Sequence, residues 1–269
     1  MKLTVHGSRG SIPISSPQTI VYGGNTSCYE LLFDDYQLIF DTGTGFRQVN
    51  LDKFKKTFIF YSHWHHDHIQ GLAFNSGIFN EEKKIYICSA LNNKITCRNL
   101  VDQYFSGSYF PIELIETLPN LMFLEFNEVQ RICKQDFSIE TLMLNHPGGA
   151  VGYSIKWNEF KISFLLDNGY SASQFSNLRD FVHESSLVVW DGMFLNEELV
   201  TKGLWGHSSI EQGIEFFQRC NITKMLITHH DPLRLDRELD KWAEKLPYGV
   251  LLARDGLIED FTYLKTEDK

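Results

Sequence analysis

Short apolar runs recur along the chain and alternate with turns rich in glycine, asparagine and aspartate. Runs of this length and composition, bounded by such turns, predict β-strands. Several of the runs end directly at a histidine or an aspartate, which places polar chemistry at strand ends. The predicted strands cover residues 2–6, 28–33, 38–40, 54–60, 84–88, 121–126, 137–144, 151–157, 160–166, 186–190 and 224–228.

Apolar positions at helical spacing predict a smaller set of helices between these strands. Ser208 or Ser209 precedes one such stretch as a candidate N-cap, and Ile210, Ile214 and Phe217 would form its apolar stripe. The chain has no fixed-period repeat, linker or low-complexity segment. We therefore predict one α/β domain over residues 1–269, with helices over residues 69–79, 92–104, 208–220 and 237–246.

The turn after the predicted strand 54–60 carries the densest group of polar side chains. Residues 61–71 read YSHWHHDHIQG, and four candidate ligands fall within six positions: His63, His65, Asp67 and His68. A continuous strand or helix would spread these side chains over different faces. A loop at a strand end can instead direct them at bound metal ions, which we favour over a solvated histidine-rich turn. His66 lies between ligand positions and is predicted to face solvent.

Other candidate ligands also follow predicted strands. They are His146 after strand 137–144, Asp167 after strand 160–166, and His229 or His230 after strand 224–228. Asp41 directly follows the strand predicted over residues 38–40, and its side chain has two interpretations. It either orients a ligand histidine or caps the turn before a glycine, and the sequence does not separate the two.

The composition is that of a globular protein, with 43% hydrophobic and 22% charged residues. Its 25 basic and 34 acidic side chains give a net charge of −9, which disfavours a surface that grips a long nucleic acid. The five cysteines are scattered and form no C-x-x-C pair, which favours a reducing compartment. No apolar stretch approaches the roughly 18 residues of a membrane span, and the N-terminus lacks an export signal, so we predict a cytoplasmic protein without a membrane anchor.

The H-x-H-x-D-H motif, followed here by Ile69, Gln70 and Gly71, resembles that of the metallo-β-lactamase-fold hydrolases. This resemblance implies a four-layer αβ/βα sandwich with a dinuclear metal site at one edge, usually zinc. Carried over position by position, it places His63, His65 and His146 on the first ion, Asp67, His68 and His229 on the second, and Asp167 between them. We prefer His229 to His230 because it follows the strand directly.

A finer resemblance concerns the stretches GSRGSIP, YGGNTSC, WDGMF, WGHSS and THHDP. They are similar to those of the tRNA 3′-processing endonuclease branch and its smaller cyclic-nucleotide phosphodiesterase relatives, including the anti-Pycsar enzymes. The resemblance implies that Asp191 orients His207 as a general acid. The tRNA-processing members carry a long basic arm before this carboxylate, whereas Asp167 and Asp191 here are only 191 − 167 = 24 positions apart.

These features predict a dinuclear zinc phosphodiesterase that opens a 3′,5′-cyclic nucleotide, with Mn²⁺ or Fe²⁺ as alternative ions. Two such ions can clamp a phosphodiester and lower the pKa of a water toward about 7, and Asp67 would accept a hydrogen bond from that nucleophile. His65 favours hydrolysis over redox chemistry, because iron-dependent redox relatives tend to carry a carboxylate there. The alternatives are a tRNA 3′-processing endoribonuclease, a thioesterase or lactonase, and a catalytically silent metal-stabilised nucleotide-binding scaffold.

The predictions for substrate contacts rest on loop positions alone. Polar residues expected to ring the metal edge are Arg9, Asn25, Ser27, Asn168 and Ser208, although such residues often only build turns. The aromatic segment 104–110 either stacks a nucleobase or forms a core edge or a subunit contact. The branch that the chain resembles is commonly homodimeric, so we expect a homodimer.

Overall fold

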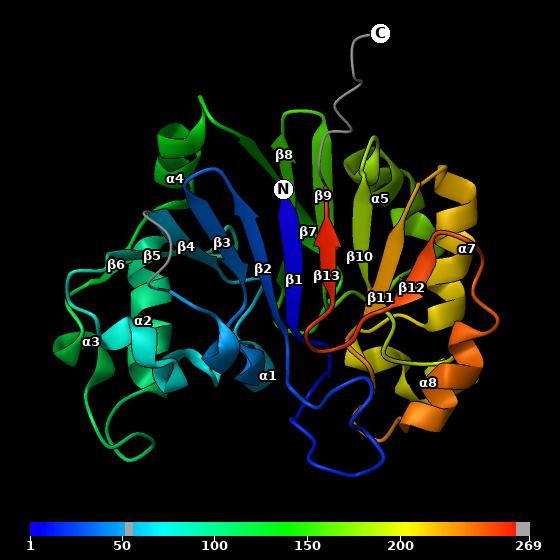
Figure 1. Ribbon diagram of the computed structural model, residues 1–269, viewed down its shortest axis with the longest axis horizontal. Helices are drawn as coiled ribbons and strands as arrows, with labels where there is room; N and C mark the ends of the chain where they lie inside the picture. The colour runs from blue at the N-terminus through cyan, green and yellow to red at the C-terminus, as the bar shows by residue number, and fades with distance from the viewer. Residues whose placement is uncertain (52–55, 262–269) are drawn as a thin grey trace, which may run out of the picture.

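The computed structural model describes residues 1–51 and 56–261 and shows two β-sheets packed face to face, with helices on both outer sides (Figure 1). The strand order is β13-β1-β2-β3-β4-β5-β6 in one sheet and β12-β11-β10-β9-β8-β7 in the other. The chain therefore has the predicted four-layer α/β architecture. Residues 52–55 and 262–269 lie outside the described part. Residues 54 and 55, the first two of the predicted strand 54–60, are therefore not described.

The first sheet joins an antiparallel half to a parallel half. Strands β13, β1, β2 and β3 pair antiparallel, whereas β3 to β6 pair parallel. Because β13 pairs with β1, the end of the described chain returns to the sheet where the chain began. The strands are β1 Lys2–Gly7, β2 Cys28–Phe33, β3 Tyr36–Phe40, β4 Lys56–Phe60, β5 Ile85–Cys88, β6 Leu121–Phe123 and β13 Ile258–Asp260.

The second sheet has the same division. Strands β7, β8 and β9 form an antiparallel meander, and β9 to β12 run parallel. Its parallel strands are buried along most of their length, as expected for strands covered on both faces. The strands are β7 Ser138–Leu144, β8 Ala150–Trp157, β9 Phe160–Leu165, β10 Leu187–Asp191, β11 Met225–Thr228 and β12 Val250–Leu252.

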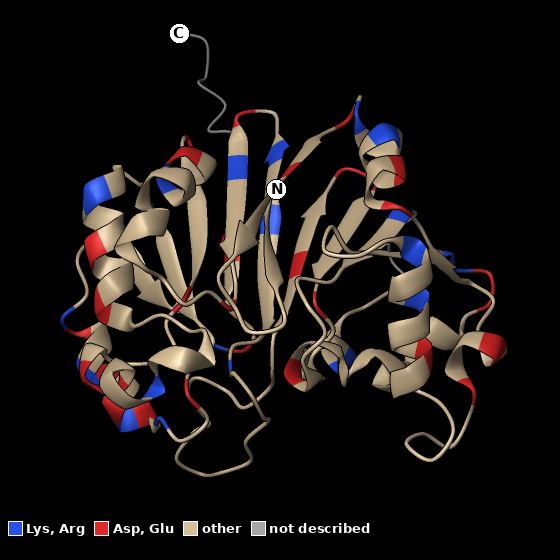
Figure 2. Cartoon of the chain, turned by 180° about the vertical axis from the view of Figure 1, so that it is seen from behind, with Lys and Arg blue, Asp and Glu red and all other residues tan. Residues whose placement is uncertain are grey.

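The helices cover the outer faces of the two sheets. The α-helices are α1 His66–Ile69, α2 Lys94–Tyr104, α3 Leu114–Thr117, α4 Phe126–Cys133, α5 Phe175–Val182, α6 Asn196–Lys202, α7 Ile210–Cys220 and α8 Asp236–Ala243. The 3₁₀ turns are η1 Thr44–Gln48, η2 Leu72–Phe74, η3 Ser76–Phe79, η4 Ala172–Gln174 and η5 Gly203–Trp205. Lysine, arginine, aspartate and glutamate are concentrated on these helices and on the loops, and the strands are mostly free of them (Figure 2). No described helix is long and apolar enough to cross a membrane.

Alternating side chains of the strands build a core between the sheets and a core under each helical layer. In β4, Phe58 and Phe60 face the second sheet, whereas Ile59 packs under α2 and α3. Phe40 and Phe164 stack across the two sheets with ring centroids 4.1 Å apart. This packing fixes both sheets relative to each other, so residues at their shared edge occupy defined positions.

The structure corrects the predicted helix over residues 69–79. The chain there forms the end of α1 and the two 3₁₀ turns η2 and η3. The Gly71 amide donates to the Thr42 carbonyl at 2.8 Å instead of continuing the helix, and Gly71 packs so closely there that a Cβ atom would lie 2.1 Å from the Gly43 carbonyl oxygen. Asn75 then accepts a hydrogen bond from the Gly77 amide and donates to the Phe46 and Val49 carbonyls. These tertiary hydrogen bonds replace those of a continuous helix.

Other elements agree with the prediction to within a few residues or were missed by it. The predicted strand over residues 121–126 ends at Phe123, and α4 begins at Phe126. Ser209, and not Ser208, caps α7, since its hydroxyl accepts from the Gln212 amide at 3.0 Å. The elements α3, α4, α5, α6, β12 and β13 were not predicted.

Candidate metal centre

Two groups of ligand atoms lie at the edge where strands of both sheets end, beside α1 (Figure 1). The first group contains His63, His65, His146 and Asp167, and the second contains Asp67, His68, Asp167 and His229. Within each group, one ligand atom per residue lies within 4.8 Å of all the others. Asp167 belongs to both groups. The structure therefore brings the predicted ligand residues together in two groups that share Asp167.

Three residues of this edge reverse the chain directly after a strand. Asp41, Asp167 and His229 have φ angles of 61°, 52° and 59°, in the left-handed region. Aspartate and histidine adopt this region more readily than branched residues, at a cost of about 1–3 kcal/mol each. The reversal turns each side chain back across the strand ends, and such stored strain is common at functional sites.

The N-terminal loop of residues 8–14 covers the second group of ligands. The Ser11 amide donates to Asp67 Oδ2 at 2.7 Å. Gly10 lies against His229 so closely that a Cβ atom would be 2.5 Å from the imidazole ring. Glycine is therefore required at position 10 to admit the ring. The sequence interpretation missed the contact of Ser11, because a backbone donor leaves no side-chain signal.

Hydrogen bonds on the far side of the rings orient the imidazoles. His68 Nδ1 donates to Asp41 Oδ2 at 2.7 Å, and His146 Nδ1 donates to the Gly206 carbonyl at 2.8 Å. Ser62 links His63 Nδ1, at 3.0 Å, to the same Asp41 carboxylate. With these Nδ1 atoms engaged, the Nε2 atoms point into the centre. Asp41 thus orients ligand histidines, which decides between its two interpretations.

Four buried atoms of the centre lack a hydrogen-bond partner among the described residues: His63 Nε2, His68 Nε2, His229 Nε2 and Asp167 Oδ1. Burying such atoms without a partner is costly. His68 Nε2 and Asp167 Oδ1 lie 3.2 Å apart, and His146 Nε2 and His65 Nδ1 lie 3.0 Å apart. Imidazole nitrogens and carboxylate oxygens converging in this way fit borderline divalent ions such as Zn²⁺. The donor set therefore suits the metals that the fold family implies.

The protonation states of the residues in the centre are consistent with binding of metal ions. Burial lowers the pKa of His63 and of His146, so both rings are neutral. Burial raises the pKa of Asp167, but the neighbouring His229 and His68 outweigh it and hold the pKa well below its usual value. His68 itself has a pKa raised well above its usual value, because Asp167, Asp67 and Asp41 outweigh its burial. Binding a cation would displace that proton.

His207 and Asp191 form a hydrogen-bonded pair beside the two ligand groups. Nδ1 of His207 donates to Asp191 Oδ2 at 2.9 Å, and Asp191 also accepts from the Asn168 and Met193 amides. The His207 ring stacks on His229, with centroids 5.0 Å apart. Burial lowers the pKa of His207, but Asp191 outweighs it and raises the pKa to about 9. A protonated imidazole is thus held next to the centre.

Arg9, which was predicted to contact substrate, lies inside the described structure. Its guanidinium is fully buried and donates to the carbonyls of Gly23, Asp231 and Arg234 at 2.8, 3.1 and 2.7 Å. The Arg9 side chain also lies 3.7 Å from the Asp236 carboxylate. These groups belong to loops far apart in the sequence, so Arg9 ties the loops together.

The other predicted substrate contacts are engaged within the protein. Asn25 donates to Asp255 Oδ2 at 3.0 Å, and Asn168 Oδ1 accepts from the Asn145 amide at 3.0 Å. The Ser208 hydroxyl donates to the Asn168 carbonyl, and the Ser27 hydroxyl lies 3.1 Å from His229 Nδ1. Asn168, Ser208 and Ser27 are at most 1% exposed, so their side chains pack within the site in this structure.

His230 and His66 lie away from the two ligand groups. His230 Nε2 donates to the Ala253 carbonyl at 2.8 Å, and burial lowers its pKa to about 3. His229, its neighbour, is the histidine that joins the second group. His66 is exposed, as expected, and its Nδ1 lies 3.1 Å from the Tyr104 hydroxyl.

The profile described as "Beta-lactamase superfamily domain" matches residues 36–230, which include both ligand groups. The chain belongs to the beta-lactamase superfamily. As a member of this superfamily of metal-dependent hydrolases, it carries the candidate metal centre where the motif predicts it.

Several relatives share this fold. The metallo-beta-lactamase fold protein YhfI from Bacillus subtilis is 20% identical, with a TM-score of 0.70 over 96% of this chain and 98% of that one. The short form of human tRNase Z is 18% identical, with a TM-score of 0.68 over 98% and 100% of the two chains. A diphosphatase from the PhnP family is 16% identical, with a TM-score of 0.68 over 97% and 98%. Among curated sequences, Ribonuclease Z from Clostridium perfringens is 23% identical over 71% of this chain and 74% of that protein.

The contacts of Asp41 lead to a testable prediction for the candidate metal centre. Asp41→Asn keeps the size of the side chain but loses a carboxylate that accepts from Ser62 and His68. We expect metal affinity to fall about 10- to 100-fold, as when a partner that orients a ligand is removed. Competition with a chromogenic chelator measures this. Asp34→Asn is the control, since Asp34 has a similar φ of 45° but lies in an exposed turn. Unchanged affinity in Asp41→Asn would refute the orienting role.

Because Arg9 is fully buried, its replacement is expected to lower the stability of the protein. Arg9→Met leaves three carbonyls and the Asp236 carboxylate without their buried partner, so the free energy of unfolding should fall by about 3 kcal/mol. Urea denaturation of the metal-loaded protein measures it. Arg47→Met, at an exposed position, should leave the transition unchanged. A rise in KM with wild-type stability would instead restore Arg9 as a substrate contact.

Proposed function

We propose that this protein is a metal-dependent phosphodiesterase that hydrolyses a small phosphodiester, a 3′,5′-cyclic nucleotide, with two Zn²⁺ ions. Mn²⁺ or Fe²⁺ are the alternative ions. The observation that carries the proposal is the His207–Asp191 pair, 2.9 Å apart, next to the two ligand groups. When bound, the two ions would supply a nucleophile at neutral pH and neutralise the phosphate charge.

The residues of the chain account for the remaining steps. Asp67 is held by the Ser11 amide and would accept a hydrogen bond from the attacking water. His207 would donate its proton to the departing ribose oxygen, which otherwise leaves as a poor alkoxide. Asp191 keeps the His207 ring in place by binding Nδ1, so that Nε2 carries the transferred proton.

The short chain segments that connect the site residues favour a small substrate. His146 and Asp167 are joined by the β8–β9 hairpin, and Asp167 and Asp191 by η4 and α5. Neither described connection extends into a long arm. The net charge of −9 likewise lacks the cationic excess that binds a long polyanion.

A second candidate is tRNA 3′ processing, favoured by the similarity to Ribonuclease Z. A panel with the metal-loaded protein tests both: cyclic mononucleotides, linear dinucleotides, a precursor tRNA and a thioester. We expect hydrolysis of cyclic mononucleotides. Intact cyclic nucleotides together with accurate cleavage of the precursor tRNA at physiological salt would replace the first proposal by the second. Thioester hydrolysis alone would exclude both.

The silent-scaffold alternative is separated by metal analysis, with fewer than one tightly bound ion per chain supporting it. A homodimer in the cytoplasm also belongs to the proposal. Light scattering coupled to size-exclusion chromatography tests the homodimer, and fractionation of the source cells tests the cytoplasmic location.

A further inference from the structure

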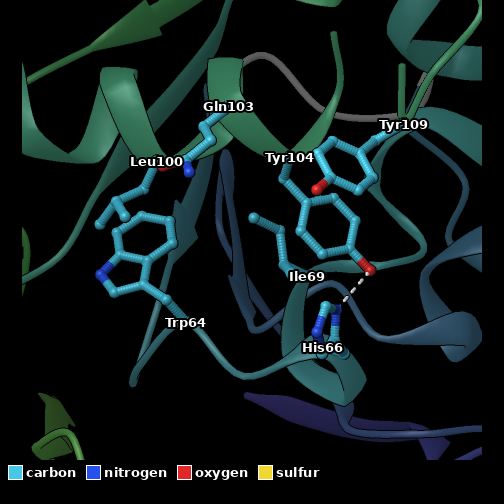
Figure 3. A pocket seen from close by; sticks show the side chains of 7 residues that line it. All are labelled: Trp64, His66, Ile69, Leu100, Gln103, Tyr104 and Tyr109. Atoms are coloured by element: carbon cyan, nitrogen blue, oxygen red, sulfur yellow. Dashed lines mark hydrogen bonds between the residues drawn. The ribbon is translucent and has the colours of Figure 1, made fainter. Parts of the chain in front are cut away.

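A cavity of about 520 Å³ lies against the turn that carries His63, His65 and Asp67, and Figure 3 shows the residues that line it. One wall comes from the metal-binding turn and α1, and the other from α2 and the loop after it. Trp64 and Tyr104 lie on opposite sides of Ile69 in this view, and Tyr109 lies next to Tyr104. Neither the mechanism nor the ligand groups use these side chains.

The cavity and the centre share one segment of chain. His63, His65 and Asp67 belong to the ligand groups. The residues between and after them, Trp64, His66 and Ile69, line the cavity. The same short turn thus carries both candidate metal ligands and residues of the cavity wall. A substrate held at the centre therefore has this cavity as an immediate neighbour.

The lining selects the chemistry of an occupant. Trp64, Tyr104 and Tyr109 supply aromatic rings, and none of the described residues that line the cavity is a lysine, arginine, aspartate or glutamate. Polar edges come from the Gln103 amide and from the His66 imidazole, whose Nδ1 lies 3.1 Å from the Tyr104 hydroxyl. An uncharged, ring-lined cavity with a few hydrogen-bonding groups suits a flat neutral ring better than a phosphate or a carboxylate.

Two further features favour a ring that enters from solvent. Tyr109 is 84% exposed, so its aromatic face is available at the cavity mouth without displacing core contacts. Trp64 is fixed from behind, since its Nε1 donates to Asn92 Oδ1 at 2.7 Å and its ring packs on Tyr61. The fixed ring of Trp64 and the exposed ring of Tyr109 would thus let a flat ring enter the cavity from solvent.

We propose that this cavity binds the nucleobase of the substrate, between Trp64 on one side and Tyr104 and Tyr109 on the other. The inference rests on the proposed phosphodiesterase function, which places the phosphate at the metal centre. Because stacking on aromatic rings tolerates every base, the site accepts purines and pyrimidines alike. The enzyme is therefore expected to have a broad base preference, with KM values within about tenfold of one another.

Alanine variants of the two tyrosines test this proposal. Tyr109→Ala and Tyr104→Ala should each raise KM for cyclic nucleotides about tenfold, which is within the range for loss of one stacked base. Tyr109→Phe, which keeps the ring, should rescue most of the affinity. Tyr248→Ala is the matched control, because Tyr248 is fully exposed between α8 and β12. The KM of a base-free substrate, methyl riboside 3′,5′-cyclic phosphate, should stay the same in both alanine variants.

A binding measurement separates this inference from the proposed function. Saturation-transfer NMR with adenosine and cytidine, which lack phosphate, should show binding to the wild type and its loss in both alanine variants. Nucleoside binding without hydrolysis of any cyclic nucleotide would overturn the phosphodiesterase and keep the base site. Hydrolysis with unchanged KM in the variants would overturn the base site and keep the phosphodiesterase. Displacement of nucleosides by an aliphatic acyl thioester, and not by other nucleosides, would assign the cavity to an acyl chain.

Discussion

Replacing His207 by alanine is expected to lower kcat for a cyclic nucleotide about 100- to 1,000-fold and to leave the metal content unchanged. The magnitude is that of losing a general acid. The metal content persists because His207 belongs to neither ligand group and contacts them through its ring, which lies against the rings of His146 and His229, and through a 4.0 Å approach to Asp167. Elemental analysis and steady-state kinetics on the same preparation measure both quantities. Loss of an ion along with activity would show that His207 holds the metal centre together.

A change of leaving group identifies the role of His207. A p-nitrophenyl phosphodiester releases a stable anion that needs no proton, so His207→Ala should cost much less with this substrate than with a ribose leaving group. Asp191→Asn is the companion variant, since it keeps the side-chain shape. Removing the carboxylate that raises the pKa of His207 should move the alkaline limb of the kcat profile to lower pH. Equal losses for both leaving groups would contradict general-acid catalysis.

The ligand set was predictable from the sequence because each ligand is local to a strand end. His63, His65, Asp67 and His68 share one turn, and His146, Asp167 and His229 each follow an apolar run. Parallel strands bring their carboxyl ends to one edge of a sheet. Strand prediction therefore places these residues at sheet edges, and the resemblance to the metallo-β-lactamase-fold hydrolases implied that they share one site. The choice of His229 over His230 agrees with the observed ligand group for the same reason.

The roles of loop residues were not predictable, because their partners lie far away in the sequence. Arg9 donates to carbonyls 222 and 225 positions away, and Asn25 donates to a carboxylate 230 positions away. No local pattern marks a residue whose partners are distant backbone groups. Asp41 illustrates the same limit. Its contact with His68, 27 positions away, decided between two interpretations that its own turn left open.

The predicted helix over residues 69–79 failed for a related reason. Its apolar spacing is real, since Ile69, Leu72 and Ile78 are buried. The spacing does not reveal that Gly71 packs on the Gly43 backbone or that Asn75 binds two carbonyls of η1 and its flank. Tertiary hydrogen bonds decided the local structure, and periodicity reported only which side chains face the core.

Replacing Asp167 by alanine is expected to reduce the bound metal from two ions to fewer than one per chain and to abolish turnover. Asp167 is common to both ligand groups, and its oxygens lie within 3.7 Å of four histidines: His63, His68, His146 and His229. Its loss leaves each group one donor short, whereas the loss of His65 or Asp67 would affect one group. Elemental analysis after dialysis measures the ions, and Asp180→Ala, at an exposed aspartate of α5, is the control.

Thermal stability shows whether Asp167 serves a metal or only an ion pair. A ligand that binds the folded state raises Tm, so Zn²⁺ should raise Tm of the wild type and of Asp180→Ala but have little effect on Asp167→Ala. Without metal, the neighbouring histidines hold the pKa of Asp167 well below its usual value, so the ionised carboxylate stabilises the fold and the metal-free variant should also lose stability. The response to zinc therefore tests the shared-ligand role. A rise of Tm with Zn²⁺ in Asp167→Ala equal to that of the wild type would refute this role.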